Sequence, residues 1–183
     1  MPPAGVAVRP SGEADVPAIQ AIYAHHVLHG LGTFEEVPPD AEEMARRRAA
    51  TRADALPHLV AQSAAGTVAG FAYLGPLNRR SAYRYTVETS LYVAAAALRQ
   101  GIGSALLAEL LRAGAAAGFR QAVALIGDRA NAGSIGVHRA FGFVEVGAMP
   151  AVGYKAGRWV DVVMMQRALG PGAAEPPGAR PSW

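Results

Sequence analysis

The segment from Glu88 to Leu111, ETSLYVAAAALRQGIGSALLAELL, constrains the fold of this chain more than any other. Its first part is rich in Thr, Tyr and Val and predicts a strand, and the spacing of Ile and Leu after Gly101 predicts an amphipathic helix. Gly101 and Gly103 stand at the junction. Because the first amides of a helix have no intrahelical partners and glycine permits close approach, the junction predicts an anion-binding site, with a simple tight turn as the alternative.

Two common anion-binding motifs do not fit this junction. A dinucleotide fingerprint needs a third glycine where the chain has Leu106. A P-loop needs a lysine at the start of the helix, and the single lysine of the chain is Lys155. Neither an NAD-type cofactor nor a nucleoside triphosphate is therefore expected here.

The remaining hydrophobic patterns predict a mixed α/β sheet. The order β-α-α-β-β-β-α-β-α-β-β is too irregular for a doubly wound fold or a barrel. We expect one domain over 1–169 and a disordered Pro/Gly-rich tail over 170–183. The expected strands cover 6–10, 58–77 (a hairpin), 82–94, 121–127, 144–150 and 158–169, and the expected helices 11–30, 38–53, 101–118 and 131–143.

Composition excludes several classes of function. The chain has no cysteine, which excludes disulfides, thiolate zinc sites and a cysteine nucleophile. The net charge is +3 and the arginines are scattered, so we expect no nucleic-acid partner. No apolar run reaches the ~18 residues of a membrane span and no signal sequence is evident, which predicts a cytoplasmic protein. His25 and His29 lie one helical turn apart without an acidic partner, so we expect no metal.

Two segments together carry a family resemblance. LYVAAAALRQGIGSALLAELL resembles the acetyl-CoA-binding motif of the GNAT superfamily of acyltransferases, and NAGSIGVHRAFGF resembles the Asn-x-x-Ser and Gly-Phe segment of that superfamily. Within it, AYRYTVETSLYV, AGFAYLGPLNRRSAY and GYKAGRWVDV are most similar to phosphinothricin and methionine-sulfoximine N-acetyltransferases. The resemblance covers about residues 6–168. One departure is Leu98, where the superfamily prefers Gln or Arg.

The resemblance implies a GNAT fold, with six to seven strands flanked by about four helices, and a function. That function is direct transfer of an acetyl group from acetyl-CoA to the α-amine of a small amino acid or analogue. Alternatives are another amine (a protein N-terminus, a polyamine or an aminoglycoside) or a catalytically silent acyl-CoA-binding module. Because members of the family are often homodimers, a homodimer is expected.

The resemblance also assigns the cofactor contacts. The pantetheine arm of acetyl-CoA pairs like an extra strand with the strand before the glycines, and the pyrophosphate lies on amides at the helix start. Arg99 or Gln100 can replace the polar contact absent at Leu98. The implied cofactor-binding residues are Leu91, Tyr92, Val93, Arg99, Gln100, Gly101, Ile102, Gly103, Ser104, Asn131 and Ser134.

Glu88 and His138 are the candidate catalytic residues. An amine must be neutral to attack a thioester, so a base is useful, and Glu88 is an acid on a strand that looks buried, with Ser90 and Tyr92 on the same face. His138 stands where many GNAT enzymes have a tyrosine that protonates the leaving thiolate. Either Glu88 is the base and His138 the acid, or His138 is the base supported by Glu88.

Four further residues are candidates for acceptor binding. Arg80 can grip a carboxylate or phosphinate through paired hydrogen bonds, and Tyr83 follows it on the same connector. Phe34 and Trp159 are candidate pocket walls, for which core packing is the competing explanation.

Overall fold

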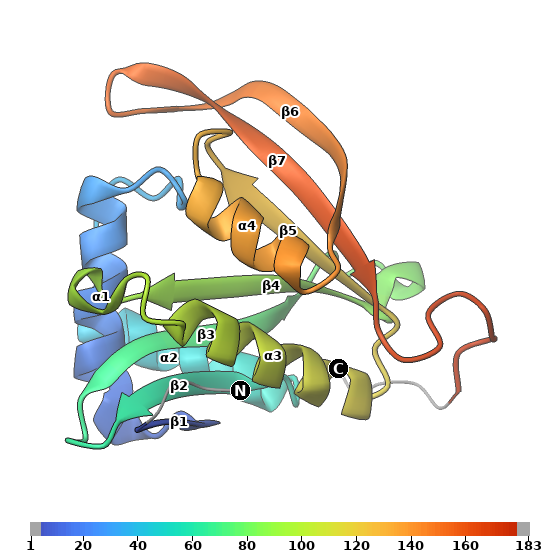
Figure 1. Cartoon of the computed structure of the whole chain (residues 1–183), viewed down its shortest axis with the longest axis horizontal. Helices are drawn as coiled ribbons and strands as arrows, with labels where there is room; N and C mark the ends of the chain where they lie inside the picture. The colour runs from blue at the N-terminus through green and yellow to red at the C-terminus, as the bar shows by residue number, and fades with distance from the viewer. Residues whose placement is uncertain (1–4, 179–183) are drawn as a thin grey trace.

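The computed structural model describes residues 5–178 (Figure 1). The order of its helices and strands is the order that the sequence predicted. Short 3-10 helices occur at Glu13–Asp15, Ser81–Tyr83 and Ala95–Ala97. The strands are β1 (Val6–Pro10), β2 (His58–Ser63), β3 (Val68–Pro76), β4 (Thr86–Val93), β5 (Gln121–Gly127), β6 (Val144–Lys155) and β7 (Arg158–Ala168), and the helices are α1 (Val16–His29), α2 (Ala41–Ala53), α3 (Ile102–Ala116) and α4 (Ala132–Ala140).

The strands form one sheet in the order β1-β2-β3-β4-β5-β7-β6. β4 and β5 are parallel, and the other neighbouring pairs are antiparallel. This agrees with the predicted mixed sheet. β6 continues to Lys155, beyond the predicted end at Pro150. A proline is tolerated there because β6 is an edge strand, where a missing N–H breaks no ladder.

Helices cover both faces of the sheet. Leu106, Leu107 and Leu110 of α3 are fully buried against one face, because their spacing places them on one side of the helix. On the other face, Ile19 of α1 and Met44 of α2 pack in a second cluster with residues of β2 and β3. In Figure 1, α3 and α4 lie in front of the sheet and α2 lies behind it.

The sheet opens between its two central strands. β4 and β5 pair only over three positions, Thr86 with Gln121, Val87 with Ala122 and Glu88 with Val123. Both strands continue past these pairs, so they diverge, and the backbone groups of the later residues that face the gap have no partner on the opposite central strand. The Thr89 hydroxyl, 3.3 Å from the Val123 carbonyl, bridges the strands at the start of the opening.

The chain after β7 stays against the body of the protein as far as it is described. Residues 170–178 form turns and bends, and Arg120 donates a hydrogen bond of 3.1 Å to the Pro176 carbonyl. Residues 179–183 of the predicted disordered tail lie outside the described residues, and the domain division stays a prediction. Over 5–178, each helix is too short or too polar to span a bilayer.

Candidate active site

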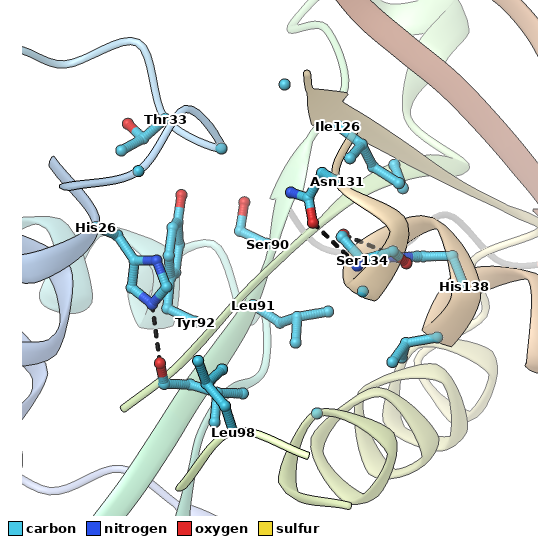
Figure 2. Close-up of a pocket in the computed structure, with 18 of the residues that line it drawn as sticks. His26, Thr33, Ser90, Leu91, Tyr92, Leu98, Ile126, Asn131, Ser134 and His138 are labelled. Atoms are coloured by element: carbon cyan, nitrogen blue, oxygen red, sulfur yellow. Dashed lines mark hydrogen bonds between the residues drawn. The ribbon is translucent and has the colours of Figure 1, made fainter. Parts of the chain in front are cut away.

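A cavity of about 1250 Å³ occupies the opening between β4 and β5. It is larger than the ~300–1,000 Å³ of a typical small-molecule pocket. Figure 2 shows His26, Thr33 and Tyr92 on one side of it, and Asn131, Ser134 and His138 of α4 on the other. The sequence-predicted residues that line it are Glu88, Leu91, Tyr92, Val93, Arg99, Gly101, Ile102, Gly103, Ser104, Asn131, Ser134 and His138.

One end of the cavity is the N-terminus of α3. Gly101 is the N-cap and has φ 78, in the left-handed region that glycine adopts without strain. The first intrahelical bond runs from the Ala105 amide to the Gly101 carbonyl, and the N-cap offers no side-chain cap. The amides of Ile102, Gly103 and Ser104 are therefore free of helical partners, and with the helix dipole they favour an anion.

Gly103 at this helix end faces β4 with room for a Cβ at ordinary van der Waals distance. A Cβ at Gly103 would lie 3.4 Å from Leu91 Cδ1 and 3.7 Å from Val93 Cγ2. Arg99 lines the cavity and has φ 60, whereas Gln100 does not line it and donates instead to the Ala96 carbonyl at 2.9 Å. Arg99 is thus the better placed of the two to replace the polar contact absent at Leu98.

The edge of β4 supplies backbone groups to the cavity. The Ala94 amide, just after β4, donates to the carbonyl of Ala69 in β3. Because backbone groups alternate in direction along an antiparallel strand, the N–H and C=O groups of Leu91 and Val93 point the other way, toward the opening. One of them is engaged: the His26 Nε2 donates to the Val93 carbonyl at 2.9 Å (Figure 2).

Glu88 is half-buried in the wall of the cavity. Burial raises the pKa of its carboxyl group above the ordinary value. Among residues 5–178, no cation lies within ion-pair distance of it. Ser90 and its cross-strand partner Tyr73 lie on the same side of the sheet as Glu88. Such a carboxylate can accept a proton.

His138 lies on the opposite side of β4 from Glu88. It is 2% exposed, its Nδ1 lies 2.9 Å from the Ser134 carbonyl, and its Nε2 lies 3.3 Å from the Thr89 hydroxyl. Because a carbonyl only accepts, Nδ1 carries the proton of the neutral ring, and its Nε2 and the Val123 carbonyl are then alternative acceptors for the single proton of the Thr89 hydroxyl. Burial lowers the pKa of His138, which favours this neutral ring. The ring nitrogens of His138 contact Thr89 and Ser134 and not Glu88, which lies on the other face of β4.

The other two contacts predicted on α4 are in place. Asn131 caps the helix: its side-chain oxygen accepts from the Ser134 amide at 3.1 Å, as Figure 2 shows. Both residues face the cavity from the side opposite His26.

The four predicted acceptor contacts do not line this cavity. Arg80 and Tyr83 are exposed on the connector between β3 and β4. Phe34 is 40% exposed and lies against Gly153, and Trp159 is 64% exposed and packs edge-on against Tyr154.

Several cavity residues were missed by the sequence reasoning. Ser90 could have been found from its parity with Glu88, and Tyr73 is its cross-strand partner. His26 and Thr33 carried no local signal, because only the folding of α1 and its following loop against β4 brings them to the cavity. Within residues 5–178, no group of three or more His, Cys, Asp or Glu side chains is placed to hold a metal ion.

Comparison with known proteins identifies the family. Residues 20–143 match the model of the acetyltransferase (GNAT) family. The chain is 47% identical over 165 residues to phosphinothricin N-acetyltransferase of Alcaligenes faecalis, covering 90% of this chain and 83% of that protein. It is 41% identical to the L-methionine sulfoximine/L-methionine sulfone acetyltransferase of Pseudomonas aeruginosa, covering 92% of this chain and 98% of that protein.

A solved structure gives the same picture of the fold. The crystal structure of a GNAT superfamily phosphinothricin acetyltransferase from Sinorhizobium meliloti, in complex with AcCoA, superposes with a TM-score of 0.92 and 43% sequence identity, covering 95% of this chain and 94% of that one. The predicted fold, the enzyme class and acetyl-CoA as the acetyl donor are thereby confirmed. The chain belongs to the GNAT family of acetyltransferases.

Proposed function

We propose that this protein acetylates the α-amine of a small amino acid or amino-acid analogue of the phosphinothricin or methionine sulfoximine type. The observation that carries the proposal is one cavity with free helix amides at one end and the unpaired carboxyl group of Glu88 in its wall. The relatives that act on such acceptors are similar to this chain over about nine-tenths of its length.

The residues present fit acetyl-CoA. The amides of Ile102 to Ser104, with Arg99 beside them, would hold the pyrophosphate, and the backbone groups of Leu91 with the Val93 amide would pair with the pantetheine amides. Bound there, acetyl-CoA supplies the acetyl group as a thioester. A backbone N–H of the β4 edge can donate to an oxygen that becomes negative during the transfer.

Glu88 is the proposed general base. An aliphatic ammonium has to lose a proton before its nitrogen can attack, and a raised carboxyl pKa brings Glu88 closer to the operating pH. His138 is assigned a positioning role, because both ring nitrogens are engaged and the ring is neutral. Of the two role assignments that the sequence left open, this favours Glu88 as base.

The acceptor is tested by an assay of thiol release from acetyl-CoA. Phosphinothricin, methionine sulfoximine, methionine sulfone and the natural L-amino acids are offered in parallel with spermidine, an aminoglycoside and a short peptide with a free N-terminus. We expect turnover in the first group. Turnover confined to the second group would show that the enzyme serves another amine. Acetyl-CoA binding without turnover of any acceptor would support a silent binding module.

A homodimer is proposed for the same protein. The β6–β7 hairpin and the loop beside it expose Phe34, Val152, Tyr154 and Trp159, which are between 40% and 64% exposed. An apolar surface of this kind is typical of an interaction site. Light scattering of the wild type and of Trp159→Ser at equal concentrations tests it: we expect a dimer that the substitution weakens, and a monomeric wild type would contradict the proposal. The cytoplasmic location stays a prediction, which cell fractionation would test.

A further inference from the structure

The wall of the cavity opposite α4 is formed by a loop. Residues 30–40 connect α1 to α2 without helix or strand, and Leu31, Gly32 and Thr33 line the cavity. In Figure 1 this loop leaves the end of α1 and reaches toward α4 and β5. A segment without backbone ladders depends on individual contacts for its placement.

Lys155, the last residue of β6, provides one such contact to the loop. Its Nζ donates a 2.7 Å hydrogen bond to the Thr33 carbonyl, and the residue is 6% exposed. Among residues 5–178, no carboxylate lies within ion-pair distance of it. Burial lowers the pKa of the ammonium, and Glu36 and Glu35 partly oppose this. A buried ammonium without an ion pair is costly, so its retention calls for a role beyond packing.

The β6–β7 hairpin fixes the position of Lys155. The turn after it, Ala156 and Gly157, has φ 50 and 74, as a two-residue turn of type I′ requires, and it sets Lys155 opposite Arg158. Two close approaches place the loop on the same half of the sheet. A Cβ at Gly153 would lie 2.4 Å from the Phe34 ring, and one at Gly127 would lie 2.2 Å from the Leu31 carbonyl.

Thr33 is held from the other half of the molecule as well. Its hydroxyl lies 3.0 Å from the Tyr23 hydroxyl of α1, which donates to Glu35 at 2.8 Å. Glu35 in turn accepts from Arg47 of α2. Thr33 is thus the point where contacts from α1 and from β6 meet, on the side of the cavity that carries Tyr92 (Figure 2).

We propose that Lys155 is a positioning residue that holds Thr33 in the cavity wall and so shapes the space for the acceptor. The inference rests on the proposed acetylation of small amino acids. It predicts that Lys155 affects recognition of the acceptor and leaves recognition of acetyl-CoA largely unchanged, because the amides of α3 lie outside the loop.

The test compares the wild type with Lys155→Met, which keeps the length of the side chain and removes the donor. We expect hydrogen exchange of the amides of residues 31–36 to become about tenfold faster or more, since a charged hydrogen bond is lost. For the acceptor that the wild type acetylates, KM should rise about tenfold, and KM for acetyl-CoA should change less than about twofold. Arg158→Met removes a cation from the same hairpin and breaks its ion pair with Asp128 but no contact to Thr33, so it should leave the exchange of the loop unchanged.

The outcomes separate this proposal from the proposed function. A wild type that acetylates no acceptor in the panel defeats the proposed function, and unchanged loop exchange in Lys155→Met overturns the role of Lys155 whatever the activity. Faster exchange with an unchanged acceptor KM overturns the link to recognition. If Lys155→Met does not fold, selective ¹³C-lysine labelling of the wild type gives the signal of its single lysine; no change in that signal on adding acceptor overturns the proposal.

Discussion

At the scale of single residues, the proposed role of Glu88 as general base makes activity depend on the protonation of its carboxyl group. An ordinary glutamate has a pKa of about 4.3. Burial raises the pKa of Glu88 above its ordinary value, so its carboxylate form, the proposed base, is populated only at a higher pH than in an ordinary glutamate. Glu88→Gln should lower kcat/KM by about 10²–10⁴-fold near neutral pH. Activity should recover partly at high pH, where more of the acceptor amine is neutral.

The measurement is a pH profile of kcat/KM for the acceptor. Glu145→Gln is a matched control on exposed β6 and should follow the wild type. An unchanged profile in Glu88→Gln would remove Glu88 as the base. Glu88→Gln should also raise Tm near neutral pH. A carboxyl group whose pKa is raised in the folded state destabilises the folded protein once the pH exceeds that pKa, and the substitution removes this cost. The gain in Tm should vanish below the ordinary glutamate pKa.

His58 governs acid stability at the same scale. Burial, with the nearby guanidinium groups of Arg48 and Arg52, lowers the pKa of His58 to about 4. Between about pH 6.5 and pH 4, His58 is protonated in the unfolded chain but stays neutral in the folded protein. The folded protein therefore loses stability as the pH falls through this window. The loss is about 3 kcal/mol at ~1.4 kcal/mol per pKa unit.

His58→Phe should reduce this acid sensitivity. The ring of His58 stacks on Phe71 and Tyr73, and its Nδ1 has no hydrogen-bond partner within the described chain, so phenylalanine keeps the stacking and breaks no bond to Nδ1. Urea unfolding at several pH values between about 4.5 and 7 checks this. Parallel curves for wild type and variant would contradict it.

At the scale of elements, the junction of β4 and α3 rests on the fit of α3 against β3. A Cβ at Gly70 would lie 2.8 Å from the Tyr92 carbonyl and 3.2 Å from Ile102 Cγ2, whereas one at Gly75 of the same strand would meet nothing within 4 Å. Gly70→Ala should therefore cost about 1–3 kcal/mol. It should also raise KM for acetyl-CoA, because Ile102 is the first residue of α3.

Gly75→Ala is the control in the same strand. It should leave the free energy of unfolding within about 0.5 kcal/mol of the wild type. Denaturant unfolding of both variants and titration with acetyl-CoA measure the two effects. Equal stability of the two alanine variants would show that the backbone around Tyr92 adapts.

At the scale of the whole molecule, two halves of the sheet meet at three β4–β5 pairs and enclose the cavity. A ligand that binds only the folded state at 100 times its Kd stabilises it by about 2.7 kcal/mol. Acetyl-CoA should accordingly raise Tm by about 5–10 °C, at ~2–4 °C per kcal/mol for a chain of this size. A thermal melt with NAD, which has a pyrophosphate but no pantetheine, serves as control. An equal shift with NAD would contradict the predicted pairing with β4.

Whether the sequence could predict a site residue depends on how far apart in the chain its contacts lie. Gly101, Gly103 and Asn131 act through the backbone of their own helix start, so spacing along the chain was enough to locate them. His26 and Thr33 reach the cavity only through contacts with Val93 and Lys155, which are 67 and 122 residues away in the chain. Hydrophobic periodicity and short motifs do not predict contacts between residues so far apart in the chain.

The sequence by itself determined the order of the elements, the glycine-bearing junction before α3 and the family, because periodicity, glycine placement and helix capping are local properties. The tertiary structure alone decided that Glu88 and His138 face opposite sides of β4, that Arg80, Tyr83, Phe34 and Trp159 lie outside the cavity lining, and that the single lysine donates a hydrogen bond to the Thr33 carbonyl. These outcomes depend on how far β4 and β5 stay paired and on which distant segments pack across the gap. Long-range packing sets both.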